Sequence, residues 1–557
     1  MPYDPDNPLV IQSDRTILAD VHSPRYEEAR EVLARFADLV KSPEHIHTYR
    51  LTPLSLWNAA ASGMTAAEMR ACLLRFSRYD VPETLLCEID DYVGRYGQVR
   101  LTAVDGRLRL VADDPLLLLE IAGHKSIQPI LLEKTRDHLG VDPAQRGRIK
   151  QELLALGFPV ADLAGYIEGS RLPVAIRAVA ADGRPFALRA YQEEAVAAFY
   201  AGGSATGGSG VVVLPCGAGK TMVGIGVMAA LCAETLILTT NTIAVRQWQA
   251  ELLDKTDLAP ESIGEYTGER KEIRPVTVTT YQILTWRRQA AEGFPHFELF
   301  AAKNWGLIIY DEVHLLPAEV FRITAELQAR RRLGLTATLV REDGRADDVF
   351  TLIGPKKYDV PWKILEEQAW IATAHCHEIR VGMPESLRLD YAVAGQHEQY
   401  RLAADNPQKD GVVMRLCARH AGERVLVIGQ YLDQLRRIAA ALGAPLITGA
   451  TPTSERARLY GAFKAGDLRL LVVSKVANFA VDLPEAGVAI QVSGTFGSRQ
   501  EEAQRLGRIL RPKADGRPAH FYTVVTRGTR DQDFAFNRQL YLAEQGYRYT
   551  IEDGEDA

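Results

Sequence analysis

The sequence predicts an α/β fold with two parallel-sheet domains in tandem, preceded by a mixed N-terminal region. From residue 184 onward, apolar strand-like runs alternate with helical segments, which is typical of a parallel sheet with crossover helices. This alternation occurs twice. The first set of strand candidates is 211–214, 236–240, 275–280, 306–310 and 333–336, and the second set is 424–429, 445–448, 468–474, 488–493 and 519–525. Two sets of five strands indicate two domains.

The region before residue 184 has no such alternation. We expect a mixed α/β module at 1–105, with a winged-helix-like part, and a small domain at 106–183. The candidate helices are 26–40, 66–76 and 145–156, and a strand-like stretch is 107–112. No catalytic constellation occurs before residue 185, so packing, regulation and direct nucleic-acid contact all stay open for this region.

The remaining segments complete the expected layout. The first α/β domain covers 184–355 and the second covers 416–545, so 356–415 is a connecting region. The Gly/Ser-rich stretch 202–210 directly precedes a strand, so we expect a surface loop there rather than an interdomain linker. The end of the chain, 546–557, is an acidic tail, and we expect disorder in its stretch Glu552 to Asp556.

Composition places the chain among ordinary globular proteins. Of its 557 residues, 47% are hydrophobic and 24% are charged, and no apolar run approaches the ~20 residues of a membrane span. The N-terminus lacks the basic and apolar regions of a signal peptide, so we expect a cytoplasmic protein. The net charge of −6 argues against a general polyanion-coating surface, although basic groups confined to one cleft would still hold nucleic acid.

The cysteines predict no metal centre. All six are scattered and form no C-x-x-C pair, so neither a zinc ribbon nor an iron–sulfur domain is expected. His375, Cys376 and His377 are consecutive, but adjacent residues on a strand point to opposite faces of the sheet. We therefore expect no metal at this tripeptide.

A glycine loop that can bind phosphates follows the strand candidate at 211–214. It ends in Gly219-Lys220-Thr221, with Leu214 where the strict motif has glycine. Backbone N–H groups of such a loop cradle phosphates, Lys220 meets the β- and γ-phosphate oxygens, and the Thr221 hydroxyl ligates Mg²⁺. The predicted cofactor contacts in this loop are Pro215, Cys216, Gly217, Ala218, Gly219, Lys220 and Thr221.

A pair of carboxylates follows another apolar run. The run 307–310 ends in Asp311-Glu312-Val313-His314, and Asp311 lies 91 residues after Lys220. Asp311 is predicted to hold the Mg²⁺ and Glu312 to orient an attacking water. A glycine turn alone can arise by accident, but the two motifs together predict an enzyme driven by a nucleoside triphosphate.

Gln192 favours adenine as the base of that nucleotide. It lies 28 residues before Lys220, in the segment Leu188-Arg189-Ala190-Tyr191-Gln192. A side-chain amide can both donate to and accept from the edge of adenine, so we place Arg189 and Gln192 in an ATP site. The alternative for Gln192 is an exposed helix residue.

Two further groups are candidates for coupling and catalysis. Hydroxyls of Thr336 and Thr338 could hydrogen-bond to the Asp311–His314 loop and, with His314, pass on the state of the γ-phosphate; a threonine-rich strand end is the alternative. A predicted helix places Gln504, Arg508 and Arg511 on one broad face. Its guanidinium groups could act as an arginine finger from the second domain, and a solvated basic helix is the alternative.

These motifs, in this order, resemble a superfamily 2 helicase, and their wording resembles the XPB family of DNA repair and transcription helicases. The resemblance spans nearly the whole chain and is most specific over 185–525. The residues that carry it are 215–221, Asp311-Glu312-Val313-His314, an R-E-D element at Arg341-Glu342-Asp343, Asp482 to Ala486, 500–511 and 7–15. Residues 478–481 depart from it, because they lack the glycine that many helicases carry in motif V.

The resemblance implies an ATP- and Mg²⁺-dependent 3′–5′ DNA helicase with two RecA-like domains, acting in DNA repair with a nuclease partner. It likens 106–183 to a damage-recognition domain and places a thumb-like insert between the motor domains, where Arg401, Lys409 and Arg415 are the strong basic points. DNA would run across both domains, held mainly through phosphates. The candidate DNA contacts are Thr240, Thr280, Arg341, Glu342, Asp343 and Ser474.

Alternatives stay open on the residues alone. A duplex translocase would pump DNA without separating its strands, and a conformational switch would use its ATPase without unwinding. An RNA helicase has the same motifs, because a phosphate track does not distinguish the sugars. The R-E-D element could equally be a charged surface turn.

Overall fold

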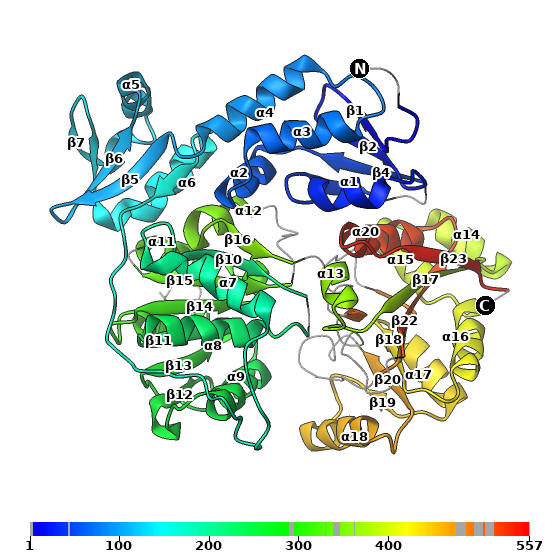
Figure 1. The fold of residues 1–557 in the computed structure, drawn as a ribbon. Helices are drawn as coiled ribbons and strands as arrows, with labels where there is room; N and C mark the ends of the chain where they lie inside the picture. Colours follow the sequence, from blue (N-terminus) through cyan, green and yellow to red (C-terminus); the bar gives the residue numbers. More distant parts are fainter. Residues whose placement is uncertain are drawn as a thin grey trace. The chain divides into compact units, whose positions relative to one another are not determined.

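The computed structural model describes residues 4–42, 45–215, 217–288, 294–328, 330–337, 346–360, 362–474, 486–494, 505–506 and 517–555. They form two compact units, one made of residues 1–38, 49–214 and 219–360 and the other of 39–48, 215–218 and 361–557. Figure 1 shows four sheets in these units, each with helices packed against it.

The N-terminal sheet has four strands in the order β1-β2-β4-β3. Its elements are β1 (Leu9–Ile11), β2 (Thr16–Asp20), α1 (Tyr26–Leu33), β3 (Asp38–Lys41), β4 (Ile46–Arg50), α2 (Pro53–Ala61), α3 (Ala66–Phe76) and α4 (Glu83–Arg95). The helix predicted at 66–76 is confirmed, with Thr65 capping it. The helix predicted at 26–40 is wrong beyond Leu33, because Asp38–Lys41 pairs in the sheet instead.

The second sheet has five strands in the order β7-β8-β6-β5-β9. Its elements are β5 (Val99–Val104), β6 (Arg107–Ala112), α5 (Pro115–Gly123), β7 (Leu131–Lys134), β8 (Leu139–Val141), α6 (Arg146–Ala155) and β9 (Val160–Asp162). The strand predicted at 107–112 is confirmed, and the helix predicted at 145–156 differs by one residue at each end.

Helix α6 ties this small domain to the α/β sheet that follows it in the chain. The buried carboxylate of Asp162 accepts hydrogen bonds from Arg146 at 2.7 Å and from Lys150 at 3.1 Å. Lys150 also donates to Gln328. A Cβ at Gly147 would lie 2.5 Å from the carbonyl oxygen of Ala325, so only glycine allows this close approach. The domain at 99–162 is therefore held against the segment that follows α11 (Ala318–Glu326).

The first α/β sheet has seven strands, and all its pairs are parallel. In sheet order they are β12 (Ile263–Tyr266), β13 (Val276–Thr280), β11 (Thr235–Thr239), β14 (Leu307–Asp311), β15 (Arg331–Thr336), β10 (Ser209–Val213) and β16 (Lys356–Asp359). The helices include α7 (Ala190–Tyr200), α8 (Lys220–Leu231), α9 (Thr242–Lys255) and α10 (Tyr281–Leu284). Five strands match the prediction; β12 and β16 were not predicted.

The second α/β sheet also has seven strands. In order they are β19 (Leu446–Ile447), β20 (Leu470–Ser474), β18 (Val425–Gly429), β21 (Val488–Gln491), β22 (Ala519–Thr526), β17 (Ala374–Val381) and β23 (Tyr549–Asp553). Its main helices are α14 (Glu385–Val393), α15 (Gln396–Ala404), α16 (Gln408–Arg419), α17 (Leu432–Leu442), α18 (Thr453–Ala465) and α20 (Arg530–Glu544). The prediction of two parallel-sheet domains after a mixed N-terminal region is thus confirmed.

The end of the chain and the connecting region both form strands that the sequence did not predict. Strand β23 lies in the predicted acidic tail and includes Glu552 and Asp553, where we expected disorder, and it pairs with β17. Its acidic residues have partners, since Glu552 bonds His377 at 2.9 Å and Asp553 pairs with Arg527. The connecting region at 356–415 contributes β16 to the first α/β sheet and β17 to the second.

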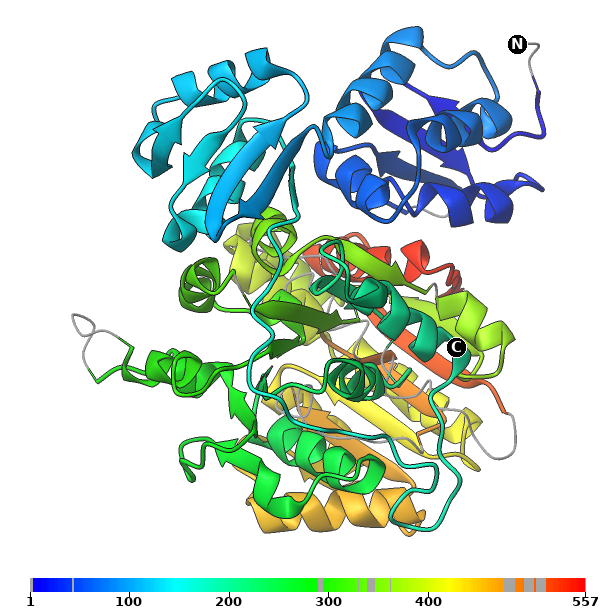
Figure 2. The same cartoon turned by 60° about the vertical axis from the view of Figure 1, so that its left-hand side comes forward.

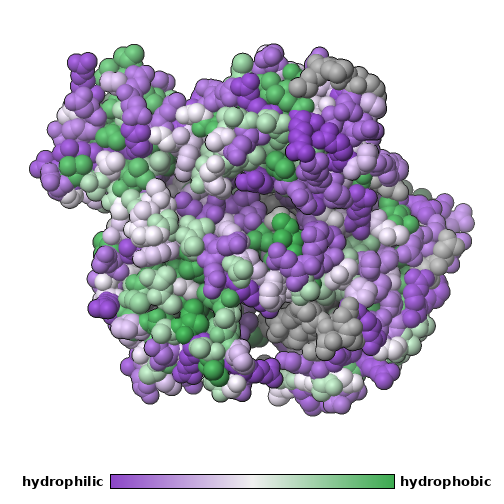
Figure 3. Space-filling model, viewed as in Figure 1, coloured by the Kyte–Doolittle hydropathy of each residue, from purple (hydrophilic) through white to green (hydrophobic). Residues whose placement is uncertain are grey.

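The short helices lie between these elements: η1 (Gln128–Ile130), η2 (Pro143–Gln145), η3 (Ala201–Gly203), η4 (Pro260–Ser262), η5 (Pro295–Phe300), η6 (Val313–Leu315), α12 (Ala346–Asp348), η7 (Val349–Ile353) and α13 (Trp362–Glu367). Within the described ranges, no helix has the length and apolar character needed to cross a membrane. Hydrophilic and hydrophobic residues are interspersed on the face drawn in Figure 3.

Candidate functional site

Strand order brings the main sequence motifs of the first α/β domain to one edge of its sheet. Strands β14, β15 and β10 are neighbours and parallel, so their carboxyl ends lie side by side (Figures 1 and 2). Asp311 ends β14 and Thr336 ends β15. The N–H of Leu214, directly after β10, donates to the carbonyl of Thr336 at 3.0 Å. Ligands of open parallel sheets bind at this edge.

The glycine loop leads into α8, which begins at Lys220. Gly217 and Gly219 have φ of 83° and 79°, a left-handed conformation that favours glycine. A Cβ at Gly219 would lie 2.6 Å from Nε2 of Gln192. Gln192 is buried, and its Oε1 accepts from the backbone N–H of Arg189 at 3.0 Å. Gln192 is therefore not an exposed helix residue but lies against the loop.

Lys220 and Glu312 face each other across this edge. The lysine Nζ lies 3.4 Å from Oε1 of Glu312, and both side chains are largely shielded from solvent. Burial would raise the pKa of Glu312, but the charges of Lys220 and His314 outweigh it and hold that pKa below its ordinary value. Glu312 also has a φ of 52°, a strained backbone of the kind that occurs at functional sites. The carboxylate is thus kept ionised beside the phosphate loop.

Asp311 is positioned by two aromatic residues that sequence reasoning missed. Trp248 on α9 donates from Nε1 to its Oδ2 at 2.9 Å, and the Tyr281 hydroxyl donates to its carbonyl at 2.8 Å. Burial, and then the neighbouring Glu312 carboxylate, raise the pKa of Asp311 to about 6. A Cβ at Gly224 in α8 would lie 2.5 Å from the indole of Trp248, so glycine leaves room for this ring.

His314 connects the carboxylate loop to β15. Its Nδ1 lies 2.6 Å from the hydroxyl of Thr336 and 3.5 Å from Oε2 of Glu312. His314 and Thr336 are both buried. Glu312, the predicted water-orienting residue, thus lies next to His314, which contacts Thr336; His314 and Thr336 are two of the predicted coupling residues.

The candidate DNA contacts with described positions lie at carboxyl ends of strands. Thr240 follows β11 and its hydroxyl accepts from Asn241 at 3.1 Å, whereas Thr280 ends β13 and caps α10 by accepting from the N–H of Ile283 at 3.3 Å. Ser474 ends β20, and its buried hydroxyl has no hydrogen-bond partner among the described residues. The sequence alone did not predict which of Thr240, Thr280 and Ser474 lie close together.

Several predicted site residues lie outside the described residues: Cys216, Thr338, Arg341, Glu342, Asp343, Gln504, Arg508 and Arg511. Arg505, which follows Gln504 in the chain, is described. It is buried, and its guanidinium donates a hydrogen bond to Gln491. Thr221 is the second residue of α8, beside Lys220.

One basic point of the thumb-like region is not on the surface. Lys409 is fully buried, pairing with Asp531 at 2.6 Å and donating to the carbonyl of Val492 at 2.9 Å. Arg401 pairs with Glu398, and Arg415 donates to the carbonyl of Gly554. Lys409 therefore has a structural partner and offers no charge to DNA.

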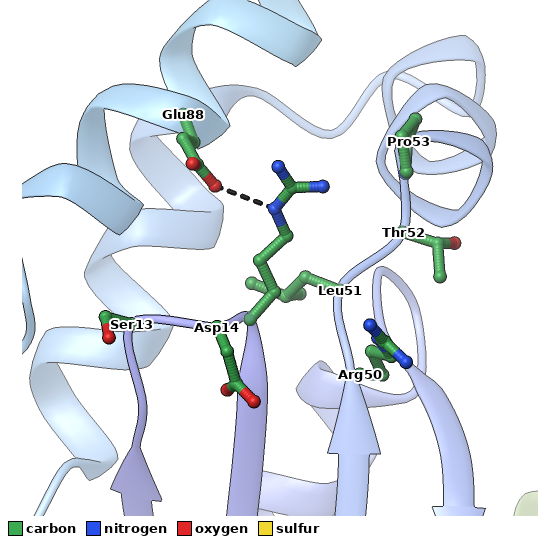
Figure 4. A pocket seen from close by; sticks show the side chains of 8 residues that line it. Ser13, Asp14, Arg50, Leu51, Thr52, Pro53 and Glu88 are labelled. Atoms are coloured by element: carbon green, nitrogen blue, oxygen red, sulfur yellow. Dashed lines mark hydrogen bonds and ion pairs between the residues drawn. The ribbon is translucent and has the colours of Figure 1, made fainter.

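A cavity of about 440 Å³ lies in the N-terminal domain, apart from these motifs. Arg15 and Glu88 line it and form an ion pair at 2.8 Å. Figure 4 labels Glu88 on one side and Arg50, Thr52 and Pro53, near the start of α2, on the other. Side chains of opposite charge line this cavity. Ser13, Asp14 and Arg15 of the segment 7–15 are among them, whereas no residue of the nucleotide-site motifs is.

Comparison with known proteins gives matches along almost the whole chain. Residues 365–554 match the ERCC3/RAD25/XPB C-terminal helicase family, 185–341 match the type III restriction enzyme res subunit family, and 9–136 match a family described as a helicase conserved C-terminal domain. The DNA 3′-5′ helicase XPB of Kineococcus radiotolerans is 56% identical, covering 99% of this chain and 97% of that protein.

Two further relatives match over nearly the same length. The DNA 3′-5′ helicase XPB of Mycobacterium tuberculosis is 54% identical, covering 99% of this chain and 98% of that protein. The general transcription and DNA repair factor IIH helicase/translocase subunit XPB of Antonospora locustae is 33% identical, covering 97% of this chain and 81% of that protein.

Proposed function

This chain belongs to the XPB family of DNA helicases, and from that premise we propose that it hydrolyses ATP to move 3′ to 5′ along DNA and separate its strands in DNA repair. The observation that carries the proposal on this chain's own residues is the cluster at one sheet edge, where Lys220, Asp311 and Glu312 meet beside the glycine loop.

The Lys220–Glu312 pair explains how the site changes when ATP arrives. The γ-phosphate offers Lys220 a stronger anionic partner than a single carboxylate, so the lysine turns to the phosphate. Glu312 is then released to accept a proton from the attacking water. Lys220 and His314 hold the pKa of Glu312 low while the pair is intact, so the carboxylate is ionised when Lys220 turns away; the loss of Lys220 then raises its affinity for the proton of the water.

Mg²⁺ fits the donors present at this edge. The Thr221 hydroxyl and the Asp311 carboxylate are oxygen ligands, which Mg²⁺ prefers. The ion would neutralise charge on the β- and γ-phosphates when bound. The indole of Trp248 orients the Asp311 carboxylate through its hydrogen bond to Oδ2.

We assign the remaining steps to the other sequence-predicted residues. Gln192 and Arg189 hold adenine, and His314 with Thr336 and Thr338 transmits the state of the γ-phosphate. Gln504, Arg508 and Arg511 complete the ATP site from the second α/β domain. The DNA track comprises Thr240, Thr280, Ser474 and Arg341-Glu342-Asp343.

ATP turnover measured with single-stranded DNA, duplex DNA, forked DNA and RNA tests this function. We expect strong stimulation by forked and single-stranded DNA and little by RNA. A 3′-tailed duplex should be unwound, whereas a 5′-tailed duplex should not. Triplex displacement without unwinding would identify a duplex translocase instead, and ATP turnover that ignores every nucleic acid would identify a conformational switch.

Two further properties, a partner and a location, are proposals. We propose a nuclease partner, which co-purification of the full chain from its own cells would test. We place the enzyme in the cytoplasm, because DNA and ATP are found there.

A further inference from the structure

The sheet edge that carries the proposed nucleotide site extends past β14 toward β12, the outermost strand on that side of the first α/β sheet. Beyond β14 the strand order runs β11, β13, β12, and all three are parallel to it. At their carboxyl ends, Thr240 follows β11, Thr280 is the last residue of β13, and Thr267 follows β12. The proposed DNA track therefore points toward the end of β12, where Tyr266 is the last residue.

An aromatic cluster stands at that end. The Tyr266 hydroxyl lies 2.9 Å from Nδ1 of His296, and the two rings meet edge to face with centroids 5.7 Å apart. The ring of Trp286, two residues after α10, lies 5.8 Å from the ring of His296. Tyr266 is buried and His296 half-buried, so Trp286 is the outer member of the cluster.

Trp286 is unusual among the tryptophans of this chain. It is 51% exposed, whereas Trp57, Trp248, Trp305 and Trp362 are buried and Trp370 is 37% exposed. The exposed ring face of Trp286 is large enough to stack on a base. Its aromatic neighbour His296 holds the indole in place from one side.

Basic side chains follow the indole in the chain and pack on rings near it, Arg287 lying 5.2 Å over the ring of Phe294. Arg287 and Arg288 follow Trp286 and are exposed, and Lys271 places its Nζ 4.6 Å from the centre of the Tyr266 ring. The nearby acidic residue Glu269 is paired with Arg246 at 3.2 Å, while Glu298 is exposed. An exposed aromatic ring flanked by cationic groups is the arrangement that binds single-stranded nucleic acid, in which bases stack and phosphates pair with the cations.

We propose that Trp286 stacks on a base of single-stranded DNA and forms the outer end of the DNA track on the first α/β domain, with Arg287 and Arg288 holding the flanking phosphates. This inference rests on the proposed function, because it needs a strand that leaves the track at Thr280. Stacking tolerates any base, so the contact adds affinity without sequence preference.

The test is equilibrium binding of the full chain to two fluorescent oligonucleotides of equal length, oligo-dT and its abasic analogue. We expect Trp286→Ala to weaken binding to oligo-dT on the order of 5- to 150-fold, and Trp286→Phe to stay near wild type because it keeps a ring. Binding to the abasic oligonucleotide should be the same for all three proteins. The salt dependence should not change in Trp286→Ala, since stacking releases no counterions, whereas Arg288→Ala should lower its slope by about 0.7.

Trp370→Ala is the matched control, because Trp370 is also partly exposed but lies in the other unit. It should bind oligo-dT like wild type. Equal affinity of Trp286→Ala and wild type for oligo-dT would overturn the proposal and leave Trp286 to a protein partner. An equal loss on the abasic oligonucleotide, or a lowered melting temperature of Trp286→Ala that Trp286→Phe does not restore, would assign the residue a structural role. If wild type binds neither oligonucleotide, the proposed function fails rather than the contact.

Discussion

The Nζ of Lys220 and Oε1 of Glu312 lie 3.4 Å apart, so the two charges neutralise each other. The pairing gives the lysine charge beside the glycine loop an opposite charge. A shielded charge without such a partner would destabilise the folded protein. The two residues have separable roles, because Lys220 would contact the phosphates and Glu312 would contact the attacking water.

Replacing each residue should separate binding from hydrolysis. Lys220→Ala should weaken ATP binding on the order of 10- to 100-fold, since it removes a charge-assisted contact to the phosphates. Glu312→Gln should bind ATP like wild type but hydrolyse it on the order of 10²- to 10⁴-fold more slowly, because the amide cannot accept the proton of water. Calorimetric titration and single-turnover hydrolysis measure the two effects; equal loss of nucleotide affinity in both variants would contradict this division.

The Trp248 indole should set the acid limit of activity. Its hydrogen bond to Asp311 favours the ionised carboxylate and opposes the burial that raises the pKa of Asp311 to about 6. Trp248→Phe removes that bond, so the pKa of Asp311 in the Mg²⁺-free enzyme should rise further, protons should compete better with Mg²⁺ for the carboxylate, and at sub-saturating Mg²⁺ the acid limb of kcat/KM should move to higher pH. A pH profile of DNA-stimulated ATP hydrolysis measures the shift. A uniform loss of rate at every pH would instead indicate that Trp248 only packs against Gly224.

At the scale of elements, the edge of the second α/β sheet is held by histidines. His375 and His377 on β17 share a face with His520 and Tyr522 on β22, as alternate residues of parallel strands do. The Nδ1 of His520 lies 3.4 Å from Nε2 of His377, and its ring lies 5.4 Å from the ring of His375 and 5.1 Å from that of His420. Glu552 on β23 bonds His377, and Glu423 bonds His420.

This cluster should make the second unit sensitive to acid. Burial, and then the neighbouring His420, His377 and His375, lower the pKa of His520 to about 4. The unfolded chain takes up a proton at His520 below its ordinary value of 6.5, while the folded chain does not until about pH 4. Stability is therefore retained above pH 6.5 and falls as the pH drops from there to about 4.

Thermal unfolding at about pH 7.5 and about pH 5 measures this loss. His520→Gln should lose less melting temperature between the two conditions than wild type, because the protonation difference is gone. His397→Gln is the control in the same unit, since His397 is exposed on α15, and it should behave like wild type. An acid loss in His520→Gln as large as in wild type would show that the cluster does not control the pH dependence.

At the scale of the whole molecule, ATP hydrolysis has to be converted into strand separation. The R-E-D element follows β15 closely in the chain, after the coupling residue Thr336. Arg341 could contact a phosphate, while Glu342 and Asp343 steer a strand by repulsion. We therefore propose that the element acts between ATP hydrolysis and strand separation.

Changing Arg341, Glu342 and Asp343 together to alanine should uncouple the two processes. We expect ATP turnover on forked DNA to remain within a few-fold of wild type, while the number of base pairs separated per ATP falls several-fold. Parallel unwinding and phosphate-release assays on one forked substrate measure the ratio. Wild-type efficiency in the triple variant would make the element a charged surface turn.

The sequence by itself determined the two parallel sheets and most of the candidate nucleotide site. Strands such as β10, β14 and β18 are buried on both faces, so their apolar runs are visible without a partner. The glycine loop and Asp311-Glu312 are contiguous, so local spacing was enough to predict them. Family membership followed from the same short motifs.

Tertiary structure alone decided what depends on partners distant in the chain. β12, β16 and β23 are short edge strands with polar residues, and pairing with β13, β10 and β17 defines them. Burial of Lys409 depends on Asp531, 122 residues away, and the orientation of Asp311 depends on Trp248. A local sequence pattern indicates which side chains of a segment are buried. It does not indicate which distant side chains pack against them, because those contacts form only in the tertiary structure.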